Sequence, residues 1–305
     1  MKKSDSRQAI NGVLLVNKPQ GLTSNGFLQQ MKRLYNARKA GHTGSLDPLA
    51  TGMLPICFGE ATKFSQYLLD ADKCYEATGL LGIKTDTADA LGNIIQETSS
   101  FTVTEHELQA ALNAFRGTIQ QVPSMFSALK HQGVPLYKYA RKGETIARAA
   151  REISIHSLEL TAFDGKSFSI RVHCSKGTYI RNLVEDIGER LRVGAHVTRL
   201  HRTHTAGFTE ETMYSLEALT EKSEAKRIAC LLPMDKIVDY MPTLCLKNEA
   251  VFALRQGKTL SEFTDNAITG CFRLYDEALQ FIGLGDINSS GTLAVKRLLA
   301  IGELN

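Results

Sequence analysis

The sequence predicts an α+β fold in which a largely antiparallel mixed sheet is flanked by helices and followed by a small β-rich C-terminal domain. Strand-like and helix-like segments are mixed along the chain without regular strand–helix–strand alternation, which favours such a sheet. After about residue 240 the pattern changes to short strand-like pieces separated by Gly, Asn and Ser. We therefore expect a flexible N-terminus over residues 1–10, a large domain over 11–240 and a small domain over 241–305.

The first predicted elements lie on either side of a short turn. An apolar run over residues 12–16 predicts a buried strand, which ends at a turn containing Pro19 and Gly21. Thr23 or Ser24 is expected to cap a helix, because the apolar residues that follow have the spacing of one helical face.

The next segment is unusual in composition. Residues 41–52 hold three glycines and a proline and lack apolar periodicity, which predicts a loop of special backbone shape. A helix is expected over residues 60–69, and alternation of apolar and polar residues predicts a strand over 73–81.

The remaining elements of the large domain follow from the same periodicities. Thr104 and Glu107 form the signature of a capping box at the start of a helix. Strand-like alternation recurs later, and helical spacing begins at Ile180. The later strands are expected near residues 153–155, 168–174 and 196–203.

Composition sets the broad class of the protein. A chain of 305 residues with 43% hydrophobic residues can bury a substantial core. The six cysteines form no CxxC pair and are expected to be free thiols in a reducing cytoplasm. The polar first residues and the absence of any 18-residue apolar run argue against secretion and against a membrane span.

The net charge of +4 is modest, but its distribution is uneven. Residues 1–40 hold eight Lys or Arg against one acid, residues 130–151 hold six against one, and residues 171–202 hold seven against three. Such clustering favours a polyanionic partner such as nucleic acid. The alternative, that these runs are ordinary solvated faces, stays open on charge alone.

Several common motifs are absent from the sequence. It contains no GxxxxGK phosphate loop, no GxGxxG after a strand, no HExxH and no Cys/His set at zinc spacing. NTPases, Rossmann enzymes and zinc hydrolases are therefore disfavoured, and we expect any chemistry to come from side chains without a cofactor or metal.

Three segments carry a resemblance to a known family. The twelve residues GHTGSLDPLATG at 41–52 closely resemble the catalytic loop of TruB-family pseudouridine synthases. NKPQGLTS at 17–24 resembles the family's Lys-Pro motif, and SKGTYIR at 175–181 resembles its third active-site segment. The resemblance spans residues 11–205, and the C-terminal module loosely resembles the PUA-like RNA-binding domain of bacterial members.

The resemblance implies an isomerase that converts uridine to pseudouridine at position 55, in the T loop of tRNA. It implies base flipping, an Asp nucleophile and no cofactor. The expected partner is the tRNA T stem-loop, and we expect a monomer without an obligate protein partner.

Asp47 and Arg181 are the expected catalytic pair. An isolated Asp-Pro such as Asp47-Pro48 most often only starts a turn, but the surrounding loop favours a carboxylate nucleophile held at a fixed angle. A carboxylate in a cleft tends to take up a proton unless a cation holds it ionised. Arg181 lies in the first turn of a predicted helix, where the helix dipole disfavours its charge, so a partner carboxylate would offset that cost. The resemblance implies that this partner is Asp47. An exposed surface arginine is the alternative.

The other expected site residues contact the substrate. The resemblance implies that Tyr75 is a third catalytic residue, which stacks on the target uracil and is a candidate to handle a proton. It also implies that His42 fills the space vacated by the flipped base, and that Tyr179 and Leu200 line the uracil pocket. Simple core packing is the alternative for Tyr75, Tyr179 and Leu200. Lys18 is expected to organise the catalytic loop or touch phosphate, unless it is only a solvated turn lysine.

Residues 130–151 interleave basic side chains with Tyr137 and Tyr139, which suits an RNA loop but also describes a helix surface. Two other functions remain possible from the sequence. The first is an RNA-binding or RNA-folding protein without catalysis. The second is a related synthase with another target, such as a guide-RNA-dependent member.

Overall fold

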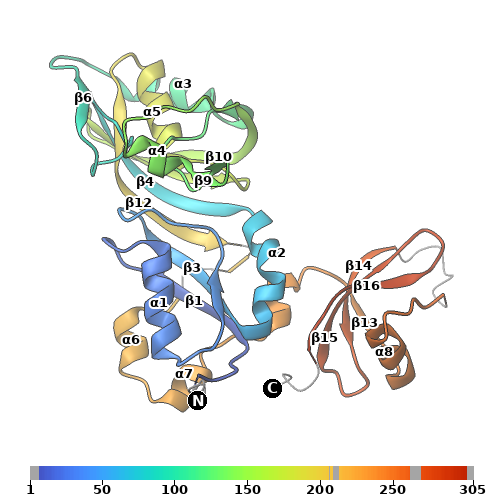
Figure 1. The fold of residues 1–305 in the computed structure, drawn as a ribbon. Helices are drawn as coiled ribbons and strands as arrows, with labels where there is room; N and C mark the ends of the chain where they lie inside the picture. Colours follow the sequence, from blue (N-terminus) through green and yellow to red (C-terminus); the bar gives the residue numbers. More distant parts are fainter. Residues whose placement is uncertain (1–6, 206, 209–212, 262–268, 301–305) are drawn as a thin grey trace.

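A mixed sheet of eight strands forms the centre of the molecule, and a separate four-stranded sheet forms its C-terminal module (Figure 1). The computed structural model describes residues 7–205, 207–208, 213–261 and 269–300. Along the large sheet the strand order is β1-β3-β12-β4-β11-β10-β7, with β2 paired to β3. Its strands are β1 (Gly12–Lys18), β2 (Ala40–His42), β3 (Thr51–Phe58), β4 (Lys73–Leu81), β7 (Gly117–Gln121), β10 (Arg151–Phe163), β11 (Ser167–Cys174) and β12 (Ala195–Thr205).

The pairing is antiparallel between neighbours in this sheet, with one parallel exception between β3 and β12. That parallel register joins His201 to Thr51 and Arg202 to Gly52. The long strands β4 and β12 connect the two lobes seen in Figure 1. The expected α+β fold with a largely antiparallel mixed sheet is confirmed.

Helices cover this sheet and pack apolar side chains against it. Phe27 of α1 and Val184 of α5 are fully buried in the same cluster as Leu54 of β3 and Phe168 of β11. The helices and 3₁₀ turns are α1 (Ser24–Leu34), η1 (Gly59–Phe64), α2 (Ser65–Asp70), α3 (Glu105–Asn113), α4 (Leu136–Ala140), α5 (Ile180–Arg190), α6 (Leu216–Thr220), α7 (Glu224–Ile228) and η3 (Met234–Val238).

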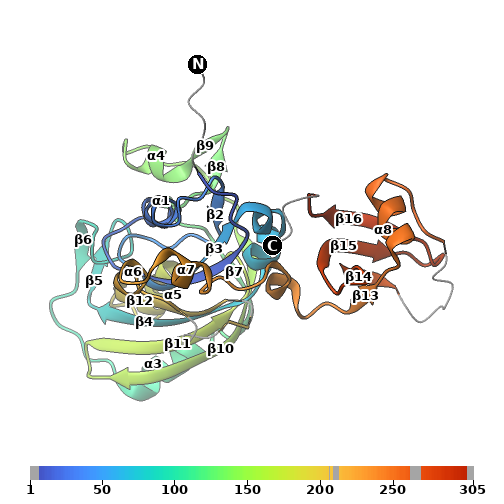
Figure 2. The ribbon, with the colours of Figure 1, turned by 90° about the horizontal axis from the view of Figure 1, so that it is seen from below.

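Two short pairs of strands complete the large domain: β5 (Ile83–Thr85) with β6 (Ile94–Glu97), and β8 (Lys130–His131) with β9 (Val134–Pro135). The segment between β7 and β10, residues 122–150, carries β8, β9 and α4. Figure 2 shows these three elements standing away from the large sheet. We call residues 122–150 the excursion.

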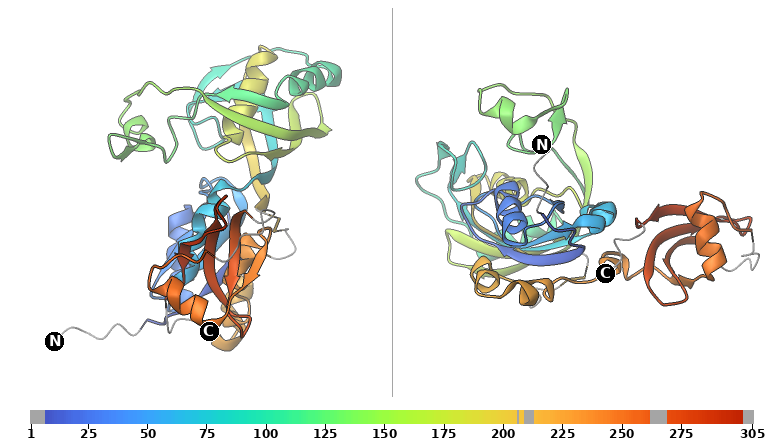
Figure 3. Two further views of the ribbon diagram at one scale, coloured as in Figure 1. Left: turned by 90° about the vertical axis from the view of Figure 1, so that its right-hand side faces the viewer. Right: turned by 60° about the horizontal axis from the view of Figure 1, so that its bottom comes forward.

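The C-terminal module consists of β13 (Thr243–Cys245), α8 (Asn248–Arg255), β14 (Gly270–Tyr275), β15 (Phe281–Ile287) and β16 (Leu293–Leu298) (Figure 3). It is attached to the large domain by packing as well as by the chain. Leu284 and Leu299 are buried in one cluster with Val13 of β1 and Val238 of η3. The backbone N–H of Ala300 donates to Glu60 Oε2 at 2.7 Å.

Local sequence signals located several elements correctly. The Thr23 hydroxyl accepts a hydrogen bond from the Gly26 N–H at the start of α1, and the strand expected over 73–81 is β4. Thr104 and Glu107 form the expected capping box of α3, with both reciprocal hydrogen bonds present.

Other expectations need correction. Residues 41–52 are not all loop, because Gly41 and His42 pair in β2 and Thr51 begins β3. The helix expected over 60–69 is a 3₁₀ turn through Phe64 before α2 begins.

Residues 1–6 of the expected flexible N-terminus lie outside the described residues. Gln8 exchanges backbone hydrogen bonds with Asn36 and Arg38, and Ile10 is buried, so residues 8–10 belong to the folded part. Among the described helices, none is long and apolar enough to cross a membrane.

Candidate active site

The loop between β2 and β3 is held in place by the segment that follows β1. The Ser24 hydroxyl accepts a hydrogen bond from the Leu46 N–H at 2.7 Å and donates to the Leu46 carbonyl oxygen at 3.0 Å. The N–H of Gly21 donates to the Pro48 carbonyl oxygen at 2.7 Å. The turn and helix cap predicted around residues 19–24 therefore fix both sides of Asp47.

Arg202 of β12 also holds this loop in place, through hydrogen bonds to its backbone. Its side chain is 1% exposed, with Nε donating to the Met53 carbonyl oxygen at 2.7 Å and Nη2 donating to the Gly44 carbonyl oxygen at 2.9 Å. Gly44 has a φ of +75°, and a Cβ on this residue would lie 3.2 Å from Arg202 Nη1. The glycine thus lets the loop pass directly over the buried guanidinium.

Gly52, at the end of the loop, is required for a similar reason. Its φ is +101°, and a Cβ would lie 2.3 Å from the Arg202 carbonyl oxygen. Arg202 was not predicted from the sequence. The one signal in the sequence was its place in the expected strand over 196–203, two residues after Leu200.

Lys18 is fully buried beside this loop. Its ammonium donates to the carbonyl oxygens of Pro19 at 2.9 Å and Leu22 at 2.7 Å. Burial disfavours the cation and lowers the pKa of Lys18 to about 8, although the nearby Asp47 carboxylate partly opposes that shift. Such burial fits a residue that organises the loop and is inconsistent with a solvated lysine or a contact to phosphate.

Asp47 and Arg181 are in direct contact. Arg181 Nε lies 2.8 Å from Asp47 Oδ2, so the loop and the start of α5 meet as the sequence analysis expected. The Arg181 side chain is 5% exposed, whereas that of Asp47 is 39% exposed because one side of the carboxylate faces a cavity. Burial by the surrounding walls raises the pKa of the Asp47 carboxyl, and the Arg181 charge opposes this rise.

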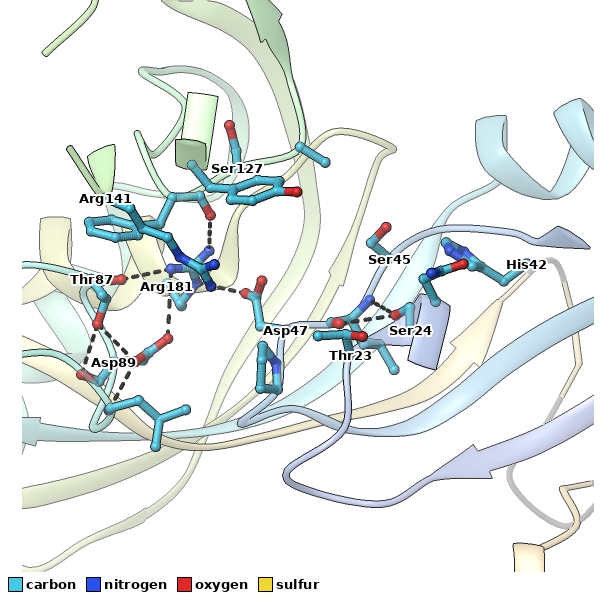
Figure 4. A pocket seen from close by; sticks show the side chains of 17 residues that line it. Thr23, Ser24, His42, Ser45, Asp47, Thr87, Asp89, Ser127, Arg141 and Arg181 are labelled. Carbon is cyan, nitrogen blue, oxygen red and sulfur yellow. Dashed lines mark hydrogen bonds and ion pairs between the residues drawn. The ribbon is translucent and has the colours of Figure 1, made fainter. Parts of the chain in front are cut away.

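The rest of the Arg181 guanidinium is also bonded (Figure 4). Nη1 donates to the Thr87 carbonyl oxygen at 2.7 Å, and Nη2 donates to the Phe126 carbonyl oxygen at 2.9 Å. Nη1 also lies 3.6 Å from Oδ2 of the buried Asp89. The arginine is thereby fixed in one orientation towards Asp47.

Asp89 was not foreseen from the sequence. Its Oδ1 accepts hydrogen bonds from the Thr87 hydroxyl at 2.8 Å and the Leu91 N–H at 3.0 Å. A second carboxylate beside Arg181 balances a cation that lies in the first turn of a helix, where the dipole is unfavourable. The only sequence signal was a polar stretch directly after the strand over residues 73–81.

Gln121 fixes the start of α5 and was also missed. Its amide is buried, with Nε2 donating to the Tyr179 carbonyl oxygen at 3.0 Å and Oε1 accepting from the Tyr179 N–H at 2.8 Å. Tyr179 is the residue before α5, and its side chain makes no capping bond. The glutamine therefore replaces a helix cap and positions Arg181 two residues later.

Two adjoining cavities share a wall that contains Asp47, Arg181, Phe126 and Ser127. The smaller cavity, of about 310 Å³, is lined by the expected residues Tyr75, Tyr179 and Leu200. In the larger one, of about 600 Å³, the lining includes His42 together with Tyr137 and Arg141 from the excursion. We call these the inner and outer cavities.

The protonation states in these cavities follow from burial. Burial raises the pKa of the Tyr75 and Tyr179 phenols, so both carry their protons at neutral pH. It lowers the pKa of His42, which therefore stays neutral. Around the inner cavity the charged groups are Asp47, Arg181, Arg202 and Lys73.

Sequence profiles of known families match nearly the whole chain. The N-terminal domain of the TruB family pseudouridylate synthases matches residues 32–180. The tRNA pseudouridylate synthase B C-terminal domain matches residues 181–239, and the C-terminal domain of pseudouridine synthase II TruB matches residues 242–299.

Curated relatives agree with the profiles. The chain is 53% identical to the tRNA pseudouridine synthase B of Legionella pneumophila over 98% of this chain and 99% of that protein. It is 50% identical to the tRNA pseudouridine synthase B of Tolumonas auensis, over 96% of this chain and 93% of the relative. A crystal structure of a Cbf5-Nop10-Gar1 complex contains a chain with 26% identity and a TM-score of 0.73, covering 97% of this chain and 87% of that one.

The fold, the cavity with its carboxylate and guanidinium, and these matches define a pseudouridine synthase. Within that class, the chain belongs to the TruB family of pseudouridylate synthases.

Proposed function

We propose that this protein isomerises uridine to pseudouridine in tRNA, acting on position 55 in the T loop. The proposal rests on membership of the TruB family and on one observation in the structure. Asp47 is 2.8 Å from Arg181 and faces a cavity that Tyr75, Tyr179 and Leu200 line.

The reaction breaks the bond between ribose C1′ and N1 of uracil, turns the base, and joins C1′ to C5. The C5 proton is lost and N1 gains one, so that atoms and charge balance without an oxidant or reductant. We assign the nucleophile to the Asp47 carboxylate. Arg181 favours its ionised form against the burial that raises its pKa.

A uridine in a folded RNA loop must leave its stack to reach Asp47. We propose that the inner cavity receives the flipped uracil, with Tyr75 stacked on the ring and Tyr179 and Leu200 as further walls. His42 lies in the outer cavity and is neutral, which suits a side chain that fills the space the base has left.

The excursion and the C-terminal module supply the remaining RNA contacts in this proposal. Tyr137 and Arg141 reach the outer cavity from the excursion, and the Arg141 guanidinium stacks 5.4 Å from the Tyr137 ring centroid. We assign residues 11–240 to catalysis and 241–305 to a PUA-like RNA-binding domain. We further propose that the protein acts in the cytoplasm as a monomer, without an obligate protein partner or cofactor.

Replacing Asp47 with Asn tests the assignment, because this change removes the charge and keeps the shape. We expect D47N to form no pseudouridine in a T stem-loop RNA labelled at C5 with tritium, while its RNA affinity stays near that of the unmodified protein. Asp164→Asn, at the exposed turn between β10 and β11, is the matched control and should retain full turnover. Tritium release by D47N at the control rate would refute the role of Asp47.

A guide-RNA-dependent synthase is the second candidate, because of the likeness to the Cbf5-Nop10-Gar1 chain. The higher identity to proteins named tRNA pseudouridine synthase B favours the first candidate. Mapping pseudouridine in total RNA after incubation with the purified protein alone distinguishes them. Modification of tRNA at position 55 without added RNA supports our proposal, and activity only with a guide RNA contradicts it. An RNA-folding protein without catalysis would show no product in a single turnover.

A further inference from the structure

Three side chains of the types that ligate metals lie together on the face of the large sheet that points away from Asp47. Along β4, Lys73 and Tyr75 are buried and line the inner cavity, whereas Cys74 between them lies on the opposite face. Asp72, just before β4, and His173 of β11 lie beside Cys74 on that outer face. His156 of β10 is the third member of the group.

The three side chains converge on one point. Asp72 Oδ2 lies 3.1 Å from His156 Nε2 and 3.9 Å from His173 Nε2. One ligand atom of each residue lies within 4.8 Å of the others. The side chains are 40 to 49% exposed, so they have room to adjust by a few tenths of an ångström.

Strand geometry explains why both imidazoles reach the same carboxylate. Ser157 is paired with His173, and a register shift between Ile155 and Ser157 inserts His156 as an extra residue in β10. Such a bulge redirects a side chain relative to regular alternation. The two imidazole rings consequently lie with their centroids 4.8 Å apart.

We infer that Asp72, His156 and His173 form a binding site for a divalent transition metal, with Zn²⁺ as the best-suited ion. Zn²⁺ binds imidazole nitrogen and carboxylate oxygen at roughly 2.0–2.2 Å, which places tetrahedral ligand atoms about 3.4 Å apart. The separations of 3.1 and 3.9 Å from Asp72 Oδ2 to the two Nε2 atoms fall on either side of that value. Water completes the coordination.

The alternative is a plain ion pair between Asp72 and one histidine. Such a pair needs only one imidazole, whereas Nε2 of both His156 and His173 faces the same carboxylate oxygen, Oδ2 of Asp72. The open space of about 520 Å³ beside the cluster gives a metal ion access, and its lining includes His173, His204 and Cys74 from three neighbouring strands.

A bound metal would crosslink three segments of the chain. It would join β10, β11 and the turn before β4, which are separate segments held together by their backbone pairing. Because β4 carries Tyr75 on its other face, this crosslink would stabilise the wall of the inner cavity without touching substrate. This role is independent of the reaction proposed above.

Zinc binding to the full-length protein tests the site. The protein is first stripped with a chelator and then titrated with Zn²⁺ in competition with a zinc-sensitive dye. We expect one Zn²⁺ per chain, and an affinity at least tenfold lower in His173→Gln and in His156→Gln. His106→Gln, which changes an exposed histidine on α3, is the matched control and should bind as the unmodified protein does.

Cobalt provides a direct view of the ligands. The unmodified protein and the His106 variant should develop visible d–d absorption with Co²⁺, and Zn²⁺ should raise their melting temperatures. Both effects should be lost in the His173 and His156 variants, with circular dichroism showing that the variants are folded. Absence of zinc binding in the unmodified protein, or equal binding by all four proteins, would overturn the inference. Pseudouridine formation should persist in chelator, which separates this site from the catalytic one.

Discussion

Arg181 and Arg202 are both almost completely buried, yet their guanidinium groups have different partners. Arg181 faces the carboxylates of Asp47 and Asp89, whereas Arg202 donates to carbonyl oxygens at both ends of the loop that carries Asp47. A buried cation beside carboxylates controls charge where substrate arrives. A buried cation beside carbonyl groups fixes the path of the backbone. We therefore propose that Arg181 mainly sets the charge of the Asp47 carboxyl and that Arg202 mainly sets the path of the loop, while both side chains line the inner cavity.

Removing Arg181 should have the largest effect on catalysis. In Arg181→Ala the Asp47 and Asp89 carboxylates lose their shared counter-charge, and burial then favours the protonated, non-nucleophilic form of Asp47. We expect single-turnover pseudouridine formation at saturating RNA to slow by about 10³-fold, comparable to the loss of a buried ion-pair partner. A rate within about tenfold of the unmodified protein would contradict the ion-pair role.

Removing Arg202 should reduce stability strongly and catalysis less than the removal of Arg181 does. Arg202→Ala leaves the Met53 and Gly44 carbonyl oxygens without their buried donor. We expect the free energy of unfolding in urea to fall by about 3 kcal/mol. Catalysis should fall less than in Arg181→Ala, because the Asp47–Arg181 contact remains. The comparison fails if the Arg202 variant is as stable as the unmodified protein.

The smallest expected effect concerns Lys18 and pH. Its pKa is lowered to about 8 in the folded protein from the ordinary value of 10.5, so the unfolded chain binds more protons between these two pH values. Stability should therefore rise with pH in this window because of Lys18. In Lys18→Met that contribution disappears, and the slope of unfolding free energy against pH should decrease by up to about 1.4 kcal/mol per pH unit.

Urea unfolding at several pH values between 8 and 10.5 measures that slope. The Lys18→Met variant must be compared with the unmodified protein at each pH. Burial also lowers the pKa of Lys73 to about 8, so Lys73 contributes to the slope in both proteins. Lys73→Met serves as the matched comparison. Identical slopes in the Lys18 variant and the unmodified protein would show that Lys18 is not buried in solution.

Periodicity and short motifs predicted the elements that depend on local sequence. Alternation predicted a strand over residues 73–81, which is β4, and the Thr104 capping box marked the start of α3. The resemblance of the glycine-rich loop and of the segment before α5 brought Asp47 and Arg181 together correctly, although their catalytic roles stay predictions.

The residues that were missed act through contacts between distant segments. Gln121 caps α5 from 58 positions away, and the Arg202 hydrogen bond to Gly44 spans 158 positions. Asp89 reaches Arg181 only after the turn that follows β5 has folded back. Their partners are mostly backbone groups, which carry no side-chain signature, so single-sequence patterns could not identify them.

The attachment of the C-terminal module has a consequence for substrate choice. Leu284 and Leu299 are buried with Val13 and Val238, and Ala300 is bonded to Glu60, so packing sets the spacing between module and catalytic cavity. On the proposed function, an RNA that contacts both the C-terminal module and the inner cavity would have to span a distance that this packing sets. The same packing would then limit which RNA lengths can engage both parts at once.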